Sequence, residues 1–375
     1  MTTSRRKFIR NSLIAAGAVA IGGAGLVRLG RSSRQALYER RDVVAGDLVA
    51  GDLRAPEEPG ARPRPLDAEA WSPATEMAPR YLELERTGEL AKREAALWKI
   101  FERCRLCPRH CGAPRAAGRA GMCGAADTFK VASIGAHFGE ERPLVGQNGS
   151  GTIFFSNCNT LCIFCQNWEI NHRGDGRESS HAKLAEKMLQ LQARGCHNIN
   201  LVTPTHLVPH IVSALRIAIK DGLNIPFVYN SSGFDSLEVI KLLDGVIDIY
   251  LPDFKYQDAK IAARFSNGAP DYPKHAAAAI KEMHRQVGDL QMVNGIAYRG
   301  LIIRHLILPD NLAGTDEFVK WVARELGPNT HVNIMAQFRP AFQSYRYPPL
   351  DRRPTQKEID QAMRWARNAG LRNLQ

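Results

Sequence analysis

The sequence predicts an α/β fold, a partial (β/α)6 barrel of the TIM-like kind, preceded by a small N-terminal cysteine-rich extension. From residue 127 to residue 375, short apolar runs that suggest buried strands alternate with helical patterns. Strands that alternate with helices form right-handed βαβ units with parallel strands. Six such runs are fewer than the strands of a closed TIM barrel, which favours a partial barrel. A doubly wound open sheet would produce much the same pattern.

The strand candidates are short, rich in β-branched residues and nearly continuous in hydrophobicity, as parallel strands covered on both faces usually are. They span residues 152–156, 198–204, 225–232, 246–254, 300–308 and 331–338. The segments that follow them are amphipathic and several end at a glycine, which favours a helix C-terminus. The predicted helices span residues 179–195, 207–222, 236–245, 273–288, 315–327 and 355–370.

The N-terminal segment, residues 1–30, resembles a twin-arginine export signal. Arg5 and Arg6 precede an uncharged run, residues 11–27, that is shorter than the ~20 apolar residues of a membrane span. The signal implies export to the periplasm or a tether to the inner membrane, and a location on the cytoplasmic face stays open. An ordinary basic tail is the alternative.

Basic residues are concentrated near the N-terminus. The chain has a net charge of +12, and residues 1–41 carry nine Lys or Arg but only one acid, Glu39. The remainder has no basic stripe interleaved with aromatic residues, so we expect no nucleic-acid partner.

A proline-rich linker, residues 31–80, leads into a third part, residues 81–126, which contains four cysteines. A helix is expected over residues 79–102, directly before them. The spacing C-x2-C-x3-C-x11-C is formed by Cys104, Cys107, Cys111 and Cys123. Four thiolates complete a metal site, either a second [4Fe–4S] cluster or a structural zinc. Two disulfides in an exported protein are the alternative.

The fourth part, residues 127–375, contains three cysteines on the loop that follows its first predicted strand. Cys158, Cys162 and Cys165 have the spacing C-x3-C-x2-C. Loops at the carboxyl ends of parallel strands carry the site in barrel folds. Three thiolates can bind three irons of a [4Fe–4S] cluster and leave the fourth iron to a small molecule. A buried or disulfide-linked trio is the alternative, although an odd, closely spaced set suits disulfides poorly.

This arrangement resembles the radical S-adenosylmethionine (SAM) superfamily, in which the open iron binds SAM and the reduced cluster cleaves it. The resemblance implies a partial barrel of the radical SAM type, a [4Fe–4S] cluster and SAM as cofactors, and an electron donor as a partner. Phe164 directly precedes the third cysteine, where the superfamily favours an aromatic residue near the adenine of SAM.

Further motifs resemble PflX-type proteins, which are relatives of pyruvate formate-lyase activating enzyme. The motifs are GSGTIFFSNCNTLCIFCQNWEI, NINLVTPTH, LPDFKY, IRHLILP and AQFRP. They occur in order and, with the upstream cysteines, cover roughly residues 100–370. The resemblance implies hydrogen abstraction from an unidentified substrate, with activation of a protein by a glycyl radical as one form of it.

The resemblance also implies SAM contacts at the strand ends. The candidates are Thr203, Thr205, His206, Asn230, Ser232, Asp253, Lys255 and His305. Lys255 and His305 are candidates for the carboxylate of SAM, with Asp253 as a polar partner. Asn230 and Ser232 are candidates for its ribose or amine. The second strand ends in VTPTH where the superfamily has Gly-Gly-Glu, which puts the usual ammonium contact in doubt. For each, a satisfied polar residue at a strand end is the alternative.

The predicted function is therefore that of a radical SAM enzyme, with SAM, an electron donor and a candidate protein substrate as partners. We assign no catalytic acid or base, because the homolysis of SAM requires none. An exported, non-catalytic iron–sulfur protein for electron transfer or assembly is the alternative, since SAM and strong reductants are cytoplasmic. Membrane association through the uncharged N-terminal run is a further expectation.

Overall fold

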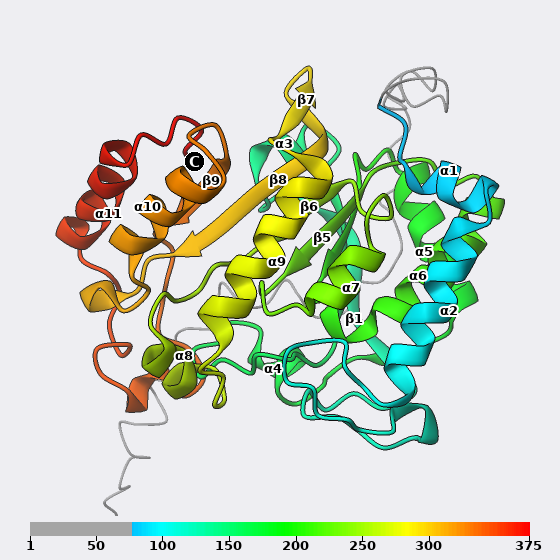
Figure 1. The fold of residues 1–375 in the computed structure, drawn as a ribbon, viewed down its shortest axis with the longest axis horizontal. Helices are drawn as coiled ribbons and strands as arrows, with labels where there is room; N and C mark the ends of the chain where they lie inside the picture. The colour runs from blue at the N-terminus through cyan, green and yellow to red at the C-terminus, as the bar shows by residue number, and fades with distance from the viewer. Residues whose placement is uncertain (1–76) are drawn as a thin grey trace, which may run out of the picture. The chain divides into compact units, whose positions relative to one another are not determined.

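The computed structural model describes residues 77–375, which lie within one compact unit. The strands are β1 (Phe129–His137), β2 (Ser150–Phe155), β3 (Arg177–Ser179), β4 (Ile199–Val202), β5 (Phe227–Ser231), β6 (Ile249–Pro252), β7 (Gln291–Val293), β8 (Ile296–Leu306) and β9 (His331–Met335). Six of them run parallel in the order β2-β4-β5-β6-β8-β9 (Figure 1). These are the six predicted strands, and within residues 77–375 no pairing joins β9 to β2. The predicted partial (β/α)6 barrel is therefore confirmed.

Three additional strands were not predicted. β1 runs antiparallel to β2, β3 runs antiparallel to β1, and β7 forms a hairpin with β8. Most of β1 is half-buried rather than alternating between buried and exposed positions, so its sequence lacks the strong period-2 pattern of a half-buried strand.

The helices are α1 (Tyr81–Arg86), α2 (Glu89–Glu102), α3 (Arg142–Val145), α4 (Trp168–Asn171), α5 (His181–Ala193), α6 (Val208–Lys220), α7 (Leu237–Leu242), α8 (Ala259–Phe265), α9 (Tyr272–Val287), α10 (Thr315–Glu325) and α11 (Gln356–Asn368). Figure 1 shows α7 and α9 in front of the sheet, α10 and α11 near β9, and α1 and α2 beside α6. The predicted helices are present, but the segment expected to be one helix over residues 79–102 splits in two. Gly88 has a φ of +74°, in the left-handed region, and a right-handed helix cannot continue through it.

The interior of the barrel changes from apolar to polar along its strands. A small buried cluster inside it consists of Leu144, Val228, Ile249, Leu251, Ala297 and Ile302. Side chains two residues apart on a strand share a face. The same face of β5, of the segment leaving β6 and of β8 therefore presents Asn230, Asp253 and Arg304 nearer the carboxyl ends. This places polar groups where barrel folds carry their sites.

The outer edge of β9 is covered by the last residues of the chain. The backbone N–H of Val332 donates to Asn373, and that of Ile334 donates to Gln375 at 3.0 Å. Residues 373–375 thus occupy the position that a further strand would take.

The predicted N-terminal export signal and nearly all of the predicted linker lie outside the described residues. From residue 77 onward, Pro79 is buried and Arg80 pairs with Asp244 at 3.1 Å. Among the helices of residues 77–375, none combines the length and apolar character that a membrane crossing requires.

Candidate active site

The three closely spaced cysteines lie on the loop between β2 and α4, at the carboxyl end of the parallel strands. We call Cys158, Cys162 and Cys165 the loop cysteines. The first two are buried, the third is partly exposed, and all three are free thiols. Asn157 and Leu161 adopt left-handed backbone conformations, with φ of +73° and +50°, which turn the loop tightly around them. The loop therefore presents three thiols where a barrel of this type carries its chemistry.

Each loop cysteine has a polar neighbour at its sulfur. The pairs are Cys158 with Thr160 Oγ1 (3.1 Å), Cys162 with Ser266 Oγ (3.1 Å) and Cys165 with Asn171 Nδ2 (3.3 Å). Hydrogen bonds to sulfur stabilise thiolates and tune the potential of a bound cluster. Sequence analysis did not find these partners, because Ser266 in particular follows α8 and lies far away in the chain.

The protonation of these thiols indicates that the loop requires a bound cation to become anionic. Burial raises the pKa of Cys158, and burial together with the other two loop cysteines raises that of Cys165 to about 12. Such thiols keep their protons at neutral pH unless a cation replaces them. No three His, Cys, Asp or Glu side chains within residues 77–375 converge on a single metal ion. A [4Fe–4S] cube instead gives each thiolate its own iron, so its ligands need not converge, and the donor set fits it.

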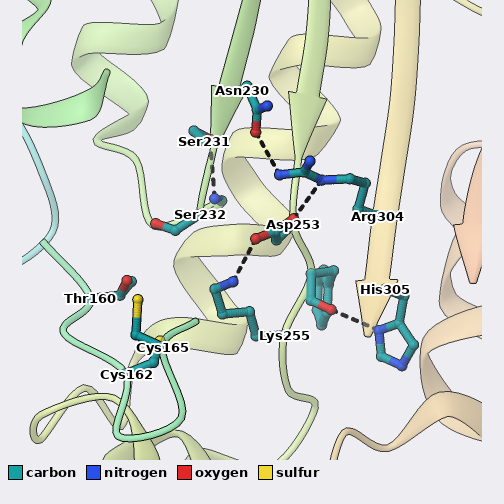
Figure 2. Close-up of polar contacts among 12 residues, drawn as sticks. Thr160, Cys162, Cys165, Asn230, Ser231, Ser232, Asp253, Lys255, Arg304 and His305 are labelled. Carbon is teal, nitrogen blue, oxygen red and sulfur yellow. Dashed lines mark hydrogen bonds and ion pairs between the residues drawn. The ribbon is translucent and has the colours of Figure 1, made fainter. Parts of the chain in front are cut away.

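A chain of charged side chains crosses the barrel interior beside this loop (Figure 2). Lys255 Nζ lies 2.5 Å from Asp253 Oδ2, and Arg304 Nε lies 2.8 Å from Asp253 Oδ1. Arg304 Nη2 also donates to Asn230 Oδ1 at 2.5 Å. On its other side, Arg304 Nη1 lies 3.7 Å from Glu140 Oε2. Asp253 is thus the shared counter-ion of two cations.

These charges fix one another's protonation states. Burial alone would raise the pKa of Asp253, but Arg304 and Lys255 outweigh it and hold that pKa below its usual value. Burial alone would lower the pKa of Lys255, but Asp253 and Cys162 outweigh it and hold that pKa above its usual value. Lys255 is therefore an ammonium at neutral pH, close enough to Cys162 to interact with its charge.

Three of the predicted SAM-contact residues meet in one place. Phe164, Asp253 and Lys255 line the same small cavity, with Leu306, Leu308 and Met335 as its apolar walls. The ring of Phe164 packs edge-on against Phe338, with 5.8 Å between centroids. The lining of the cavity combines an aromatic ring, apolar side chains and an ammonium paired with a carboxylate.

The other predicted strand-end residues are occupied by protein contacts. The hydroxyl of Thr205 donates to Asp235 Oδ1 at 2.7 Å, and that of Ser232 lies 3.4 Å from Asn159 Oδ1. Thr203 has a φ of +61° and its N–H donates to the carbonyl of Asn230. Asn159 lies between two loop cysteines, so Ser232 reaches the cysteine loop itself.

His206 and His305 are both held by other groups. His206 is buried, and its Nε2 lies 2.8 Å from the carbonyl of Ser156. His305, the other residue predicted to contact the carboxylate of SAM, is hydrogen-bonded to protein groups at both ring nitrogens. Its Nδ1 lies 2.7 Å from the carbonyl of Phe254, and its Nε2 lies 3.0 Å from Thr315 Oγ1.

The inward-facing residue on this strand is Arg304, the neighbour of His305 in sequence, which sequence analysis did not select. Successive side chains of a strand point to opposite faces, so only one of the pair can face the barrel interior. Figure 2 shows Arg304 directed toward Asp253 and His305 directed away from it. Ile302 on β8 belongs to the apolar cluster inside the barrel, and residues two apart on a strand share a face. This alternation could have identified Arg304 from the sequence.

The four upstream cysteines, Cys104, Cys107, Cys111 and Cys123, lie on the loops that follow α2. All eight cysteines of the chain are free, so the alternative of two disulfides finds no support here. The segment contacts the cysteine loop through Arg109, whose guanidinium donates to the carbonyls of Asn159 (2.6 Å) and Ser266 (2.9 Å). The two groups of cysteines are therefore neighbours in space.

Comparison with known proteins agrees with this geometry. Residues 152–296 match the radical SAM superfamily, and that range includes the loop cysteines. An uncharacterised protein of Methanocaldococcus jannaschii is 33% identical over 281 residues, which cover 72% of this chain and 76% of the relative. A solved structure, TYW1 with a lysine–pyruvate adduct bound, has a TM-score of 0.38 and 13% identity, and the match covers 58% of this chain and 73% of that one.

Proposed function

The chain belongs to the radical SAM superfamily, and on this basis we propose that it cleaves SAM reductively at the cysteine loop and abstracts hydrogen from a substrate. The observation that carries the proposal is the free thiol trio at the carboxyl end of β2, beside an ammonium and an aromatic ring. When bound, the reduced [4Fe–4S] cluster supplies the electron that breaks a carbon–sulfur bond of the sulfonium.

The residues of the chain have distinct parts in this proposal. The loop cysteines hold three irons, and their hydroxyl and amide neighbours stabilise the thiolates. Lys255 binds the carboxylate of SAM, and Asp253 keeps Lys255 charged and in place. Phe164 packs near the adenine. The burial of the loop and cavity excludes water from the reacting atoms.

The substrate proposal rests on the motifs that resemble PflX-type relatives of pyruvate formate-lyase activating enzyme. LPDFKY is the motif with a structural counterpart, because it places Asp253 and Lys255 together beside Cys162. We propose hydrogen abstraction from a protein, with formation of a glycyl radical as the reaction to examine first.

The direct test is anaerobic reconstitution with iron and sulfide, followed by addition of SAM and dithionite. We expect 5′-deoxyadenosine from the full-length protein and none after all three loop cysteines are replaced by alanine. Cys196→Ala is the matched control, because Cys196 is also buried and free but lies outside both cysteine groups. An intact cluster that leaves SAM unchanged would favour the non-catalytic electron carrier instead.

Lys255→Met separates SAM binding from cluster binding. The variant should keep its iron content but require a higher SAM concentration to change the electron paramagnetic resonance (EPR) spectrum of the reduced cluster. An unchanged SAM dependence would contradict the role given to Lys255.

The cellular location is a separate proposal. We propose that Arg5 and Arg6 direct the folded protein to the twin-arginine export route, or that the N-terminus tethers it to the inner membrane. Residues 1–50 fused to a reporter should give export that stops when both arginines are replaced by lysine. Export that continues in this variant would contradict the proposed signal.

A further inference from the structure

The upstream cysteines form one compact group although they span twenty residues of chain. The N–H of Gly112 donates to the carbonyl of Cys104, which folds residues 104–112 back on themselves. A methyl group placed on Gly121 would lie 3.2 Å from Cys111 Sγ, so the turn before Cys123 packs on the third cysteine. The same methyl group would lie 3.8 Å from Cδ of Arg115, whose Nη1 lies 3.8 Å from Cys104 Sγ. These contacts gather Cys104, Cys111 and the turn before Cys123 around one side chain, that of Arg115.

A buried cation without an anionic partner lies at this group. Arg115 is fully buried, and its Nη2 has no hydrogen-bond partner. Its other guanidinium nitrogens meet the carbonyls of His206 (2.6 Å) and Ala126 (3.1 Å) and the sulfur of Cys104 (3.8 Å). Among these groups only the thiol can become an anion. An isolated buried charge is costly, so the site calls for negative charge on its cysteines, which metal binding provides.

The surroundings of the group favour an iron–sulfur cluster over zinc. The group adjoins the loop cysteines through Arg109, which donates to the carbonyls of Asn159 at 2.6 Å and of Ser266 at 2.9 Å. A cluster at this position can pass an electron to a cluster held by the loop cysteines, whereas zinc has no redox chemistry.

The two cysteine groups touch through the residues beside them. A methyl group on Gly124, which follows Cys123, would lie 2.7 Å from Asn157 Nδ2, and Asn157 precedes Cys158. Arg109, between Cys107 and Cys111, donates to the carbonyl of Asn159 at 2.6 Å. Met122, the neighbour of Cys123, is 51% exposed and Cys111 is partly exposed, so the upstream group reaches the surface of the protein.

We infer that the upstream cysteines hold a second iron–sulfur cluster that passes electrons to the cluster of the loop cysteines. A low-potential one-electron carrier protein reduces the upstream cluster and is oxidised by one electron. The same electron then reduces the cluster of the loop cysteines, which we call the inner cluster, and no atom is transferred. The binding of the second cluster stands on the upstream geometry, whereas its electron-transfer role rests on the proposed function.

Metal analysis of the full-length protein, purified without oxygen, tests the cluster. We expect about eight irons per chain, and about four after either cysteine group is replaced by alanine. The iron left by the loop-cysteine variant should not respond to SAM, and that left by the upstream variant should. Zinc in the upstream group, or a loop-cysteine variant without iron, would overturn the inference. Loss of SAM response alone would overturn only the proposed function. Cys196→Ala is the control for a buried cysteine.

A variant of Arg115 provides a second test, in which the upstream cluster is retained and its reduction potential is measured. Arg115→Met should shift the reduction potential of the upstream cluster to more negative values, because a buried positive charge that favours the added electron is lost. Arg119→Met is the matched control, since Arg119 is exposed on the same segment, and it should cause no shift. Equal potentials in both variants would contradict the role of Arg115.

Electron transfer is tested with reduced flavodoxin as the carrier. Replacing the upstream cysteines should slow the reduction of the inner cluster by flavodoxin but not its response to SAM once dithionite has reduced it. An unchanged rate of reduction by flavodoxin would overturn the electron-transfer role and leave the metal site standing on its own result.

Discussion

At the residue scale, the site depends on a carboxylate that serves two buried cations. Asp253 pairs with Lys255 and Arg304 inside the barrel, where water screens charges weakly. Such groups stabilise a protein only while every member has its partner, and removing one partner is expensive. The same arrangement keeps Lys255 charged and correctly placed for an anionic ligand.

Replacing Asp253 by asparagine should therefore be costly. We expect Asp253→Asn to lower the free energy of unfolding by about 3 kcal/mol, because two buried cations lose their shared counter-ion. The matched control is Asp310→Asn, which removes an exposed ion pair with Arg352 and should cost less than about 1 kcal/mol. Urea denaturation measures both, and equal losses would contradict the argument.

His305 should make stability depend on pH. Burial lowers the pKa of its imidazole to about 4, from an unfolded value near 6.5. Below pH 6.5 the unfolded chain binds a proton that the folded chain does not, so stability is lost as pH falls toward 4. We expect the loss to be about 1.4 kcal/mol per pH unit from this residue, and His305→Gln should remove that part of the slope. The measurement is the free energy of unfolding against pH. Equal slopes for the unchanged protein and His305→Gln between pH 6 and 5 would contradict this role of His305.

These two residues show what the sequence could predict at this scale. The motif LPDFKY identified Asp253 and Lys255, and the cysteine spacing identified the loop, because both signals are local. The choice between Arg304 and His305 required knowing which face of β8 is inward. Ser266 could not be found at all, because only the folded chain brings it to Cys162.

At the element scale, the strands were predictable because parallel strands covered on both faces are continuous apolar runs. β1 was not, since it lies at the antiparallel end of the sheet and is largely half-buried. Helix ends depended on side chains that cap them. At the start of α5, for example, the side chain of Ser180 accepts the N–H of Lys183.

The clearest cap to test belongs to α11. Thr355 and Glu358 form a capping box, in which each side chain accepts a backbone N–H of the other. We expect Thr355→Ala to lower the free energy of unfolding by about 1 kcal/mol. Lys357→Ala, an exposed position in the same turn, should stay within about 0.5 kcal/mol of the unchanged protein. A larger loss in the control would show that the cap is not the cause.

At the scale of the whole molecule, the cysteine-rich segment and the barrel act as one structure. Arg109 joins the upstream group to the carbonyls of Asn159 and Ser266, which come from two separate parts of the barrel. Sequence analysis placed the two cysteine groups in different parts of the chain and had no means of bringing them together, because that contact is long-range.

Two glycines of this segment allow the contact to be tested. Gly124 and Gly118 have φ of +85° and +76°, so alanine strains the backbone at both by roughly 1 kcal/mol. Only at Gly124 would the added methyl group collide with Asn157, whereas at Gly118 its nearest neighbour is 3.9 Å away. We expect Gly124→Ala to alter the EPR spectrum of the inner cluster and Gly118→Ala to leave it unchanged. Identical EPR spectra for the two variants would show that the contact between Gly124 and Asn157 does not affect the loop cysteines.

The tail that pairs with β9 has a practical meaning for handling the molecule. Residues 373–375 cover hydrogen-bonding groups that would otherwise recruit a strand from another molecule. A purification tag fused directly after Gln375 would disturb the pairing of residues 373–375 with β9. Removal of these residues would leave the backbone N–H groups of Val332 and Ile334 unpaired at the edge of the sheet. Self-association after such a change would come from the uncovered edge of β9.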